Sequence, residues 1–147
     1  MTRDEIMALE VGPETDALVA GCVGAPGTWA WKVSINGRWH EERTWIPFGY
    51  SPSEPPAGWY AGMMPRPYST DIRAAMEALV VMEGRRILST LSQKSGVGRD
   101  GEFEKVMWAV DLRECVEPWR DWSAFDPSLP LAICKAILLA MTFENDV

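Results

Sequence analysis

The stretch Leu129-Pro130-Leu131-Ala132-Ile133-Cys134-Lys135-Ala136-Ile137-Leu138-Leu139-Ala140 carries one charged residue, Lys135, and the next charge along the chain is Glu144. Ser128, Leu129 and Pro130 are typical of a helix start, because a proline is tolerated in the first turn. A helix that is apolar on nearly all sides lies inside a protein, since a surface helix needs a polar face. We therefore predict that this segment is a central helix.

Three helices are expected nearer the N-terminus. Thr2 begins the first, with Glu5 three residues later as its capping-box partner. Pro13 suits the first turn of the second helix. The third spans about 71–82, where apolar residues recur at helical spacing, and Gly84 is expected to close it as the residue that follows a helix end.

A hairpin is expected between the second and third helices. Residues 29–35 alternate in a period of two, which is typical of a strand. Asn36-Gly37 directly after them is a strong hairpin signal, with a return strand over 38–46. The long segment 51–67 is rich in proline and glycine, and loops of that length in compact domains tend to be functional or disordered.

The remaining chain predicts two more strands, over 85–92 and 102–112, joined by a glycine-rich turn at 94–101. Residues 114–129 are expected to form a loop. Together with the hairpin, these strands make an antiparallel sheet of about four strands covered by helices. The predicted fold class is therefore α+β, in one domain that spans residues 1–147.

Composition limits the classes of partner. The chain has 147 residues, a formal net charge of −7 and a pI of about 4.7. Nucleic acids and anionic membranes attract basic proteins, so neither is an expected partner. No apolar run has the length of a membrane span or of a signal peptide. Cys22, Cys115 and Cys134 form no disulfide pattern, which favours a reducing, cytosolic location.

The residues that most catalytic sites need are missing. His40 is the only histidine, and without it no Ser-His-Asp or Cys-His set can form; we expect it to be a surface residue of the hairpin. No paired cysteines suit zinc, and no phosphate-binding loop is present. We therefore expect a protein without enzymatic activity, cofactor or metal.

Three segments together resemble the phage ABA sandwich domain family. They are 14–20, 129–140, and Pro67-Tyr68-Ser69-Thr70-Asp71-Ile72 with the helix behind it. The resemblance implies a short phage-encoded chain, located in the host cytoplasm, that places a sheet between helices as an αβα sandwich. The family carries no established general activity, so the resemblance bears on the fold more than on the function.

Tryptophan is strongly enriched, with eight residues in the chain. Only part of this aromatic surface is needed for one core, to which we assign Trp108 and one of Trp29 and Trp31. The remaining rings, close to several arginines, suggest a pocket for a planar ring or a protein–protein interface.

By analogy with phage proteins that sequester bacterial defence signals, we expect a homo-oligomeric binder of a small nucleotide, of the ADP-ribose or cyclic-dinucleotide type. The helix start after Pro67 and the nearby aromatic loop suggest its site. The candidate ligand-binding residues are Trp59, Tyr60, Arg66, Tyr68, Ser69, Thr70, Asp71 and Arg73. The alternative is an interaction module that binds a host or phage protein through the hairpin and loop. A carboxylate-based hydrolase ranks third.

Overall fold

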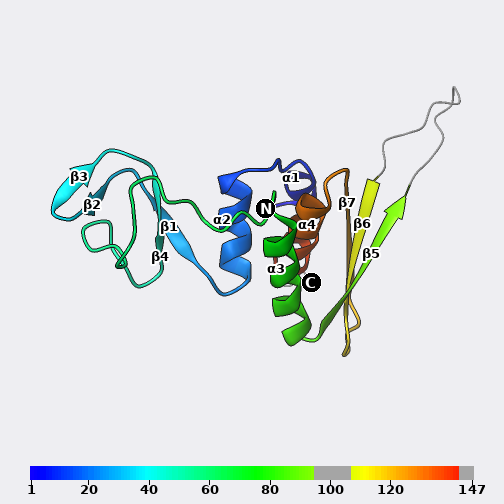
Figure 1. The fold of residues 1–147 in the computed structure, drawn as a ribbon. Helices are drawn as coiled ribbons and strands as arrows, with labels where there is room; N and C mark the ends of the chain where they lie inside the picture. Colours follow the sequence, from blue (N-terminus) through cyan, green and yellow to red (C-terminus); the bar gives the residue numbers. More distant parts are fainter. Residues whose placement is uncertain (95–106, 143–147) are drawn as a thin grey trace, which may run out of the picture.

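The computed structural model describes residues 1–94 and 107–142, and its mixture of helices and antiparallel strands confirms the α+β class (Figure 1). The elements follow in the order α1 Arg3–Met7, α2 Pro13–Cys22, β1 Gly27–Ala30, β2 Val33–Ile35, β3 Arg38–His40, β4 Thr44–Pro47, α3 Ile72–Gly84, β5 Ile87–Lys94, β6 Met107–Glu114, β7 Asp121–Asp126 and α4 Leu129–Thr142. The expected turn at 94–101 and the beginning of the expected strand 102–112 lie outside the described residues, apart from Lys94 in β5.

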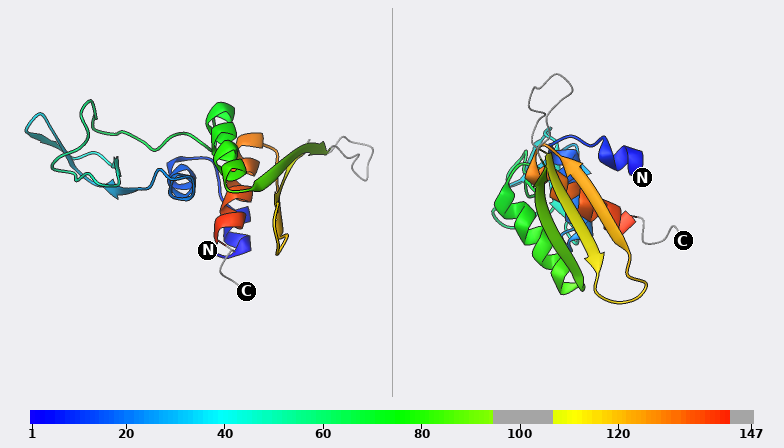
Figure 2. Two further views of the ribbon diagram at one scale, coloured as in Figure 1. Left: turned by 90° about the horizontal axis from the view of Figure 1, so that it is seen from below. Right: turned by 90° about the vertical axis from the view of Figure 1, so that its right-hand side faces the viewer.

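Helix α4 is the centre of the molecule, as its sequence predicts. All ten residues from Leu131 to Ala140 are buried. One side of α4 packs against β6 and β7, and its other sides contact α1, α2 and α3. Figure 2 shows this arrangement, with the helices gathered behind the sheet in its right-hand view. Every other helix of the described chain therefore packs against one apolar helix.

The single charge on α4 is held by two partners inside the protein. Lys135 is only 4% exposed, and its Nζ donates to the backbone oxygen of Met7 and to Oδ2 of Asp126, each at 2.8 Å. Asp126 also accepts a 2.8 Å hydrogen bond from the backbone N–H of Ser128, just before α4. A buried ammonium is tolerated only when it is paired in this way. The pair ties the ends of α1 and β7 to α4.

Replacement of Lys135 tests this link. Lys135→Met keeps the apolar stem but leaves the Asp126 carboxylate without its ion-pair partner, so we expect a loss of about 3 kcal/mol in the free energy of unfolding. Lys32→Met is the matched control, because Lys32 is exposed. Urea denaturation of both variants measures the difference. Equal stability of the two variants would show that the buried pair contributes nothing.

The main sheet has three strands in the order β5-β6-β7, all antiparallel. One face carries Leu91, Val110 and Ala124 in register and packs on the helices. The other face is mostly polar and carries Thr90, Asp111 and Ser123 in the next row. We expected a sheet of about four strands sandwiched between helices. The observed main sheet has three strands, and helices cover only one of its faces (Figure 2).

Strand β7 was not expected, because residues 114–129 read as a loop. Within it Trp122 and Ala124 face the core, while Asp121, Ser123 and Phe125 face outward. The polar and acidic residues around these two inward positions hide the period of two. The prediction for this segment was wrong, and the strand it missed forms an edge of the main sheet.

The hairpin and the loop behind it form an arm, defined here as residues 25–67, which extends away from α2 (Figure 1). Strand β1 pairs with β4, and β2 pairs with β3. Asn36 and Gly37 form the expected turn, with φ values of 53° and 78°. A small core of Ala30, Val33 and Ile46 lies inside the arm.

The arm is not the continuous hairpin that the alternating pattern predicts. The ladder stops at Ala30 and resumes at Val33, so Trp31 and Lys32 leave it. Trp31 therefore faces solvent, whereas Val33 is buried, although the alternation places both on one strand face. Two short sheets replace the single long pair of strands because the return strand is interrupted as well, between His40 and Thr44.

Aromatic packing joins the arm to the body. The rings of Trp29 and Trp45 meet edge to face with centroids 5.2 Å apart. The Arg43 guanidinium lies 3.7 Å from the Trp29 ring centre and 2.5 Å from a carboxylate oxygen of Glu14 on α2. Gly27 is required here, since a Cβ would lie 2.5 Å from the Ile46 carbonyl oxygen.

Candidate functional site

The candidate ligand-binding residues extend from the arm, which holds Trp59, Tyr60 and Arg66, through the connection 68–71 to Arg73 in α3. The structure uses several of them for folding. The side chain of Asp71 accepts hydrogen bonds from the backbone N–H groups of Arg73, at 2.8 Å, and Ala74, at 3.4 Å. Asp71 is therefore the cap of α3. These N–H groups at the helix start are already bonded to a carboxylate of the protein itself.

Ser69 connects α3 to α2 in the interior. Its backbone N–H donates to Oδ1 of Asp16 at 2.7 Å, and its Oγ accepts from the backbone N–H of Gly12 at 3.0 Å. Both Ser69 and Asp16 are buried. Burial raises the pKa of the Asp16 carboxyl above its ordinary value, and the hydrogen bonds from Ser69 only partly offset that effect.

Three of the candidates share a hollow between the end of α2 and the arm. Trp59, Arg66 and Tyr68 line a cavity of about 200 Å³. Arg66 forms an ion pair with Glu77 of α3, and the Tyr68 side chain is buried, which raises the pKa of its hydroxyl. The remaining wall consists of Ala20, Ala25, Pro26, Trp45, Pro47, Met64 and Pro65. Tyr60, Thr70 and Arg73 are exposed and do not line this hollow.

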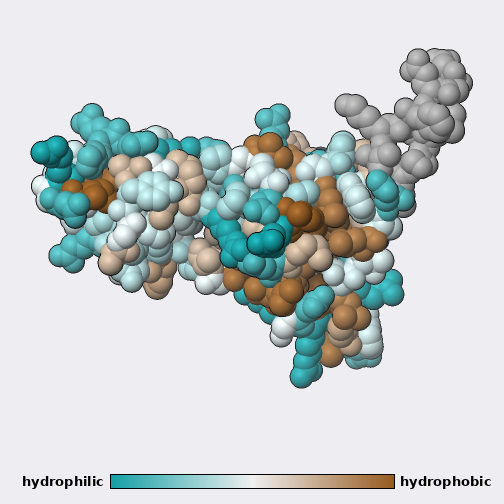
Figure 3. All heavy atoms as spheres, viewed as in Figure 1, coloured by the Kyte–Doolittle hydropathy of each residue, from teal (hydrophilic) through white to brown (hydrophobic). Residues whose placement is uncertain are grey.

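The arm exposes more aromatic surface than any other described feature of the chain. Five of its aromatic residues are more than half exposed: Trp31 at 75%, Trp39 at 53%, Phe48 at 82%, Tyr50 at 55% and Tyr60 at 59%. Figure 3 places the most hydrophobic residues mainly over the helical body, since tryptophan and tyrosine are not strongly hydrophobic on its scale. The aromatic surface of the arm is therefore a separate feature.

Phe48 and Tyr50 were missed by the sequence reasoning, which focused on tryptophan. Their position was a usable signal, because they directly follow β4, where the chain enters the proline-rich loop. Trp45 and Ile46 of β4 are already buried, so aromatic residues in the loop directly after this strand are expected to remain exposed. Tyr60 is the one expected ligand residue that belongs to this exposed set.

The loop that carries these rings is fixed to β4. The backbone N–H of Trp45 donates to the Met63 oxygen at 2.7 Å, and the Thr44 hydroxyl accepts from the backbone N–H of Gly62 at 2.9 Å. The indole N–H of Trp59 donates to the Trp45 oxygen at 2.9 Å. The loop that carries Phe48, Tyr50 and Tyr60 is therefore held in place by hydrogen bonds to β4.

The charges exposed on the arm are balanced. Lys32 and Arg38 are exposed cations, and Glu41, Glu42 and Glu54 are exposed anions. The other two arginines of the arm are paired with carboxylates of the body, Arg43 with Glu14 and Arg66 with Glu77. The aromatic surface therefore lacks the basic character that phosphate backbones require.

No family model, curated protein or solved structure matches the chain. Within residues 1–94 and 107–142, no helix has the length and apolar character to cross a membrane. The same residues contain no cluster of three or more histidine, cysteine or carboxylate side chains suited to a metal ion.

The buried Asp16 predicts a specific dependence of stability on pH. The pKa of Asp16 is raised in the folded state, so the folded state binds a proton at this carboxyl more tightly than the unfolded state does. The pKa of Asp16 in the unfolded state is near the ordinary 3.8. At a pH above the folded pKa, the ionised Asp16 carboxylate therefore lowers the free energy of unfolding. This destabilisation disappears as the pH falls through the folded pKa towards the unfolded pKa of 3.8.

Asp16→Asn removes this titration and keeps an oxygen for the Ser69 N–H. The free energy of unfolding of the wild type, minus that of the variant, is expected to increase as the pH falls. Glu14→Gln is the control of opposite sign, since the hydrogen bond from Arg43 lowers the pKa of Glu14. Denaturation series between pH 7 and pH 3.5 measure both, and a pH-independent difference for Asp16→Asn would contradict this prediction.

Proposed function

We propose that the chain is a non-catalytic binding protein that holds a protein partner through the aromatic surface of its arm. The observation that carries this proposal is the exposure of Trp31, Trp39, Phe48, Tyr50 and Tyr60. These rings are in excess, because Trp29, Trp45 and Trp59 already fill the interior of the arm and its junction with the body.

Exposed rings of this kind are typical of protein interfaces. Tryptophan and tyrosine are enriched among the residues that contribute most to binding, because each offers a large apolar surface at a small cost in side-chain entropy. The exposure of five large aromatic residues on one arm favours an interaction site. The expected partner surface is apolar with a polar rim.

The support beneath the rings favours tight binding. The bonds from Trp45 to Met63 and from Trp59 to Trp45 hold the loop before any partner arrives. A surface ordered in advance loses less conformational entropy on association. The mixture of exposed Lys32 and Arg38 with three exposed glutamates supports a protein partner rather than a nucleic acid.

Loss of the rings is expected to abolish the interaction. In the triple variant Trp39→Ser, Phe48→Ser, Tyr60→Ser, three exposed rings are removed and the fold is expected to persist, because none belongs to a core. Partners captured from a bacterial host lysate by the wild type are identified, purified and titrated by calorimetry. We expect the triple variant to bind at least about 100-fold more weakly.

The matched control is Val80→Ser with Leu88→Ser, two exposed apolar residues of the body at 63% and 61% exposure. It is expected to bind like the wild type. Unchanged affinity of the triple variant, with reduced affinity of the control, would place the interface on the body and refute the proposal.

A second candidate function is sequestration of a nucleotide signal, and the shared hollow of Trp59, Arg66 and Tyr68 favours it. The hollow is small for a whole nucleotide, so a second copy of the chain would complete the site in a homo-oligomer. The resemblance to the phage ABA sandwich family implies a phage protein in the host cytoplasm, and the role against anti-phage defence rests on the analogy with phage proteins that sequester such signals.

Calorimetry with cyclic dinucleotides and ADP-ribose derivatives tests this candidate. We expect micromolar binding by one of these ligands, and at least a tenfold loss in Arg66→Ala, because the guanidinium is the cation of the hollow. Arg113→Ala, on the outer face of the sheet, is the control. Absence of heat with every ligand, or equal binding by both variants, would eliminate this function.

A further inference from the structure

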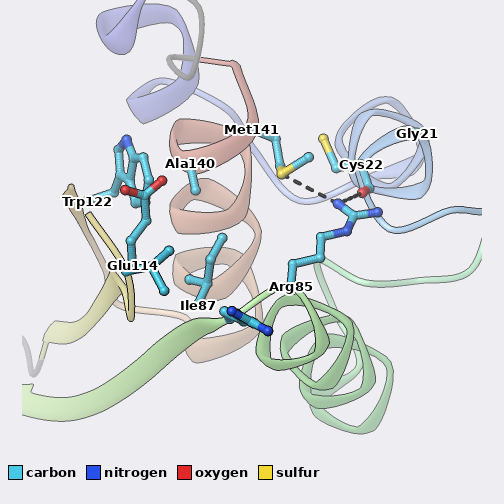
Figure 4. A pocket seen from close by; sticks show the side chains of 10 residues that line it. Gly21, Cys22, Arg85, Ile87, Glu114, Trp122, Ala140 and Met141 are labelled. Atoms are coloured by element: carbon cyan, nitrogen blue, oxygen red, sulfur yellow. Dashed lines mark hydrogen bonds between the residues drawn. The ribbon is translucent and has the colours of Figure 1, made fainter. Parts of the chain in front are cut away.

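A second cavity, of about 290 Å³, lies where α2, α3 and α4 end (Figure 4). Trp122 and Arg85 stand on opposite sides of it, and Ile87 and Ala140 lie between them. Neither the aromatic arm nor the hollow beside Trp59 contributes to this cavity. It combines an apolar wall, one indole ring and two arginines, Arg85 and Arg86.

The Arg85 side chain is bonded to other residues of this cavity. Its Nη1 donates to the backbone oxygen of Cys22 at 2.6 Å and lies 3.5 Å from the Met141 sulfur, as Figure 4 shows. The end of a helix carries partial negative charge on its carbonyl groups, and Arg85 compensates that charge at the end of α2. The carbonyl group that would most repel an anion is thus already bonded.

The Arg86 side chain differs from that of Arg85 in its contacts. No hydrogen bond or ion pair joins its side chain to the described residues, although it lines the cavity. Its backbone is fixed, because its N–H donates to the Glu83 oxygen at 3.0 Å and its carbonyl accepts from Cys115 at 2.9 Å.

The backbone of Arg86 also has a φ of +62°, a left-handed conformation that favours glycine. Gly84 was expected to take the conformation that closes α3, yet Gly84 remains in the helix and the strained residue is Arg86. Strain of this kind at a fixed, charged position is a mark of functional sites.

The other ionisable groups leave the cavity electropositive. The Glu114 carboxylate is bound by the Arg120 side chain at 2.7 and 3.2 Å and by its backbone N–H at 3.1 Å, and these bonds lower the pKa of Glu114. Burial raises the pKa of the Cys22 thiol, so that group stays neutral. As far as the described residues go, the guanidinium of Arg86 is therefore available to an anion.

We propose that this cavity binds a small organic anion, a carboxylate or phosphate monoester with a planar apolar body, whose charged group pairs with Arg86. The planar body lies between Trp122 and Ile87, and the guanidinium offers the forked pair of donors that suits either anion. The volume fits a compound of one ring, near the lower end of the range for ligand pockets.

Arg86→Gly separates binding from stability. The variant removes the cation and places glycine where φ is positive, so its melting temperature is expected to rise by about 2–4 °C. The probes are benzoate and phenyl phosphate, with benzamide as the neutral equivalent of benzoate. Titrations of ¹⁵N-labelled protein follow the amides of Gly21, Ile87 and Met141 and the indole N–H of Trp122.

We expect saturable shifts at these four sites with both anions and none with benzamide. Arg86→Gly is expected to bind at least tenfold more weakly, whereas Arg113→Ala, which also removes one positive charge, binds like the wild type. Equal affinity of Arg86→Gly, equal shifts with benzamide, or no shift with either anion at millimolar concentration would each overturn the proposal.

Discussion

Burial of α4 on every side is the constraint around which the described chain is arranged. Ten consecutive buried residues need the sheet on one side and three helices on the others. The one charge in that segment, Lys135, must then find its partners inside, and it does so at Met7 and Asp126. The same contacts that neutralise the ammonium therefore hold α1 and β7 in place.

This arrangement also determines what is left for binding. The apolar residues of the body are buried around α4, and Trp29 and Trp45 of the arm pack against the same core. Inside the arm, Trp59 is the aromatic residue that packs against the core of Ala30, Val33 and Ile46. The aromatic residues beyond Trp59 therefore remain at the surface, which is why the arm, rather than the predicted helix start, is the most prominent candidate for an interface.

The predictable parts of the structure are those in which local chemistry and burial agree. The apolar α4, the Thr2 capping box and the Asn36-Gly37 turn each depend on neighbouring residues, and all three are confirmed. Strand β7 was missed because its pattern is broken by polar residues. The role of Ser69 depends on its contact with Asp16, 53 residues away, and the left-handed φ of Arg86 is one that arginine rarely adopts, so sequence spacing contains neither. The Asp71 cap is a local contact, which sequence spacing does contain.

Native-state hydrogen exchange tests most directly whether α4 is the stable centre and the arm a separate, weaker unit. Amides of residues 133–139 are expected to exchange only through global unfolding, with the free energy that denaturant titration gives for the whole chain. Amides that pair β2 with β3 are expected to exchange through smaller openings that are insensitive to low denaturant. Exchange of the α4 amides at the rate of the β2–β3 amides would contradict the central position assigned to α4.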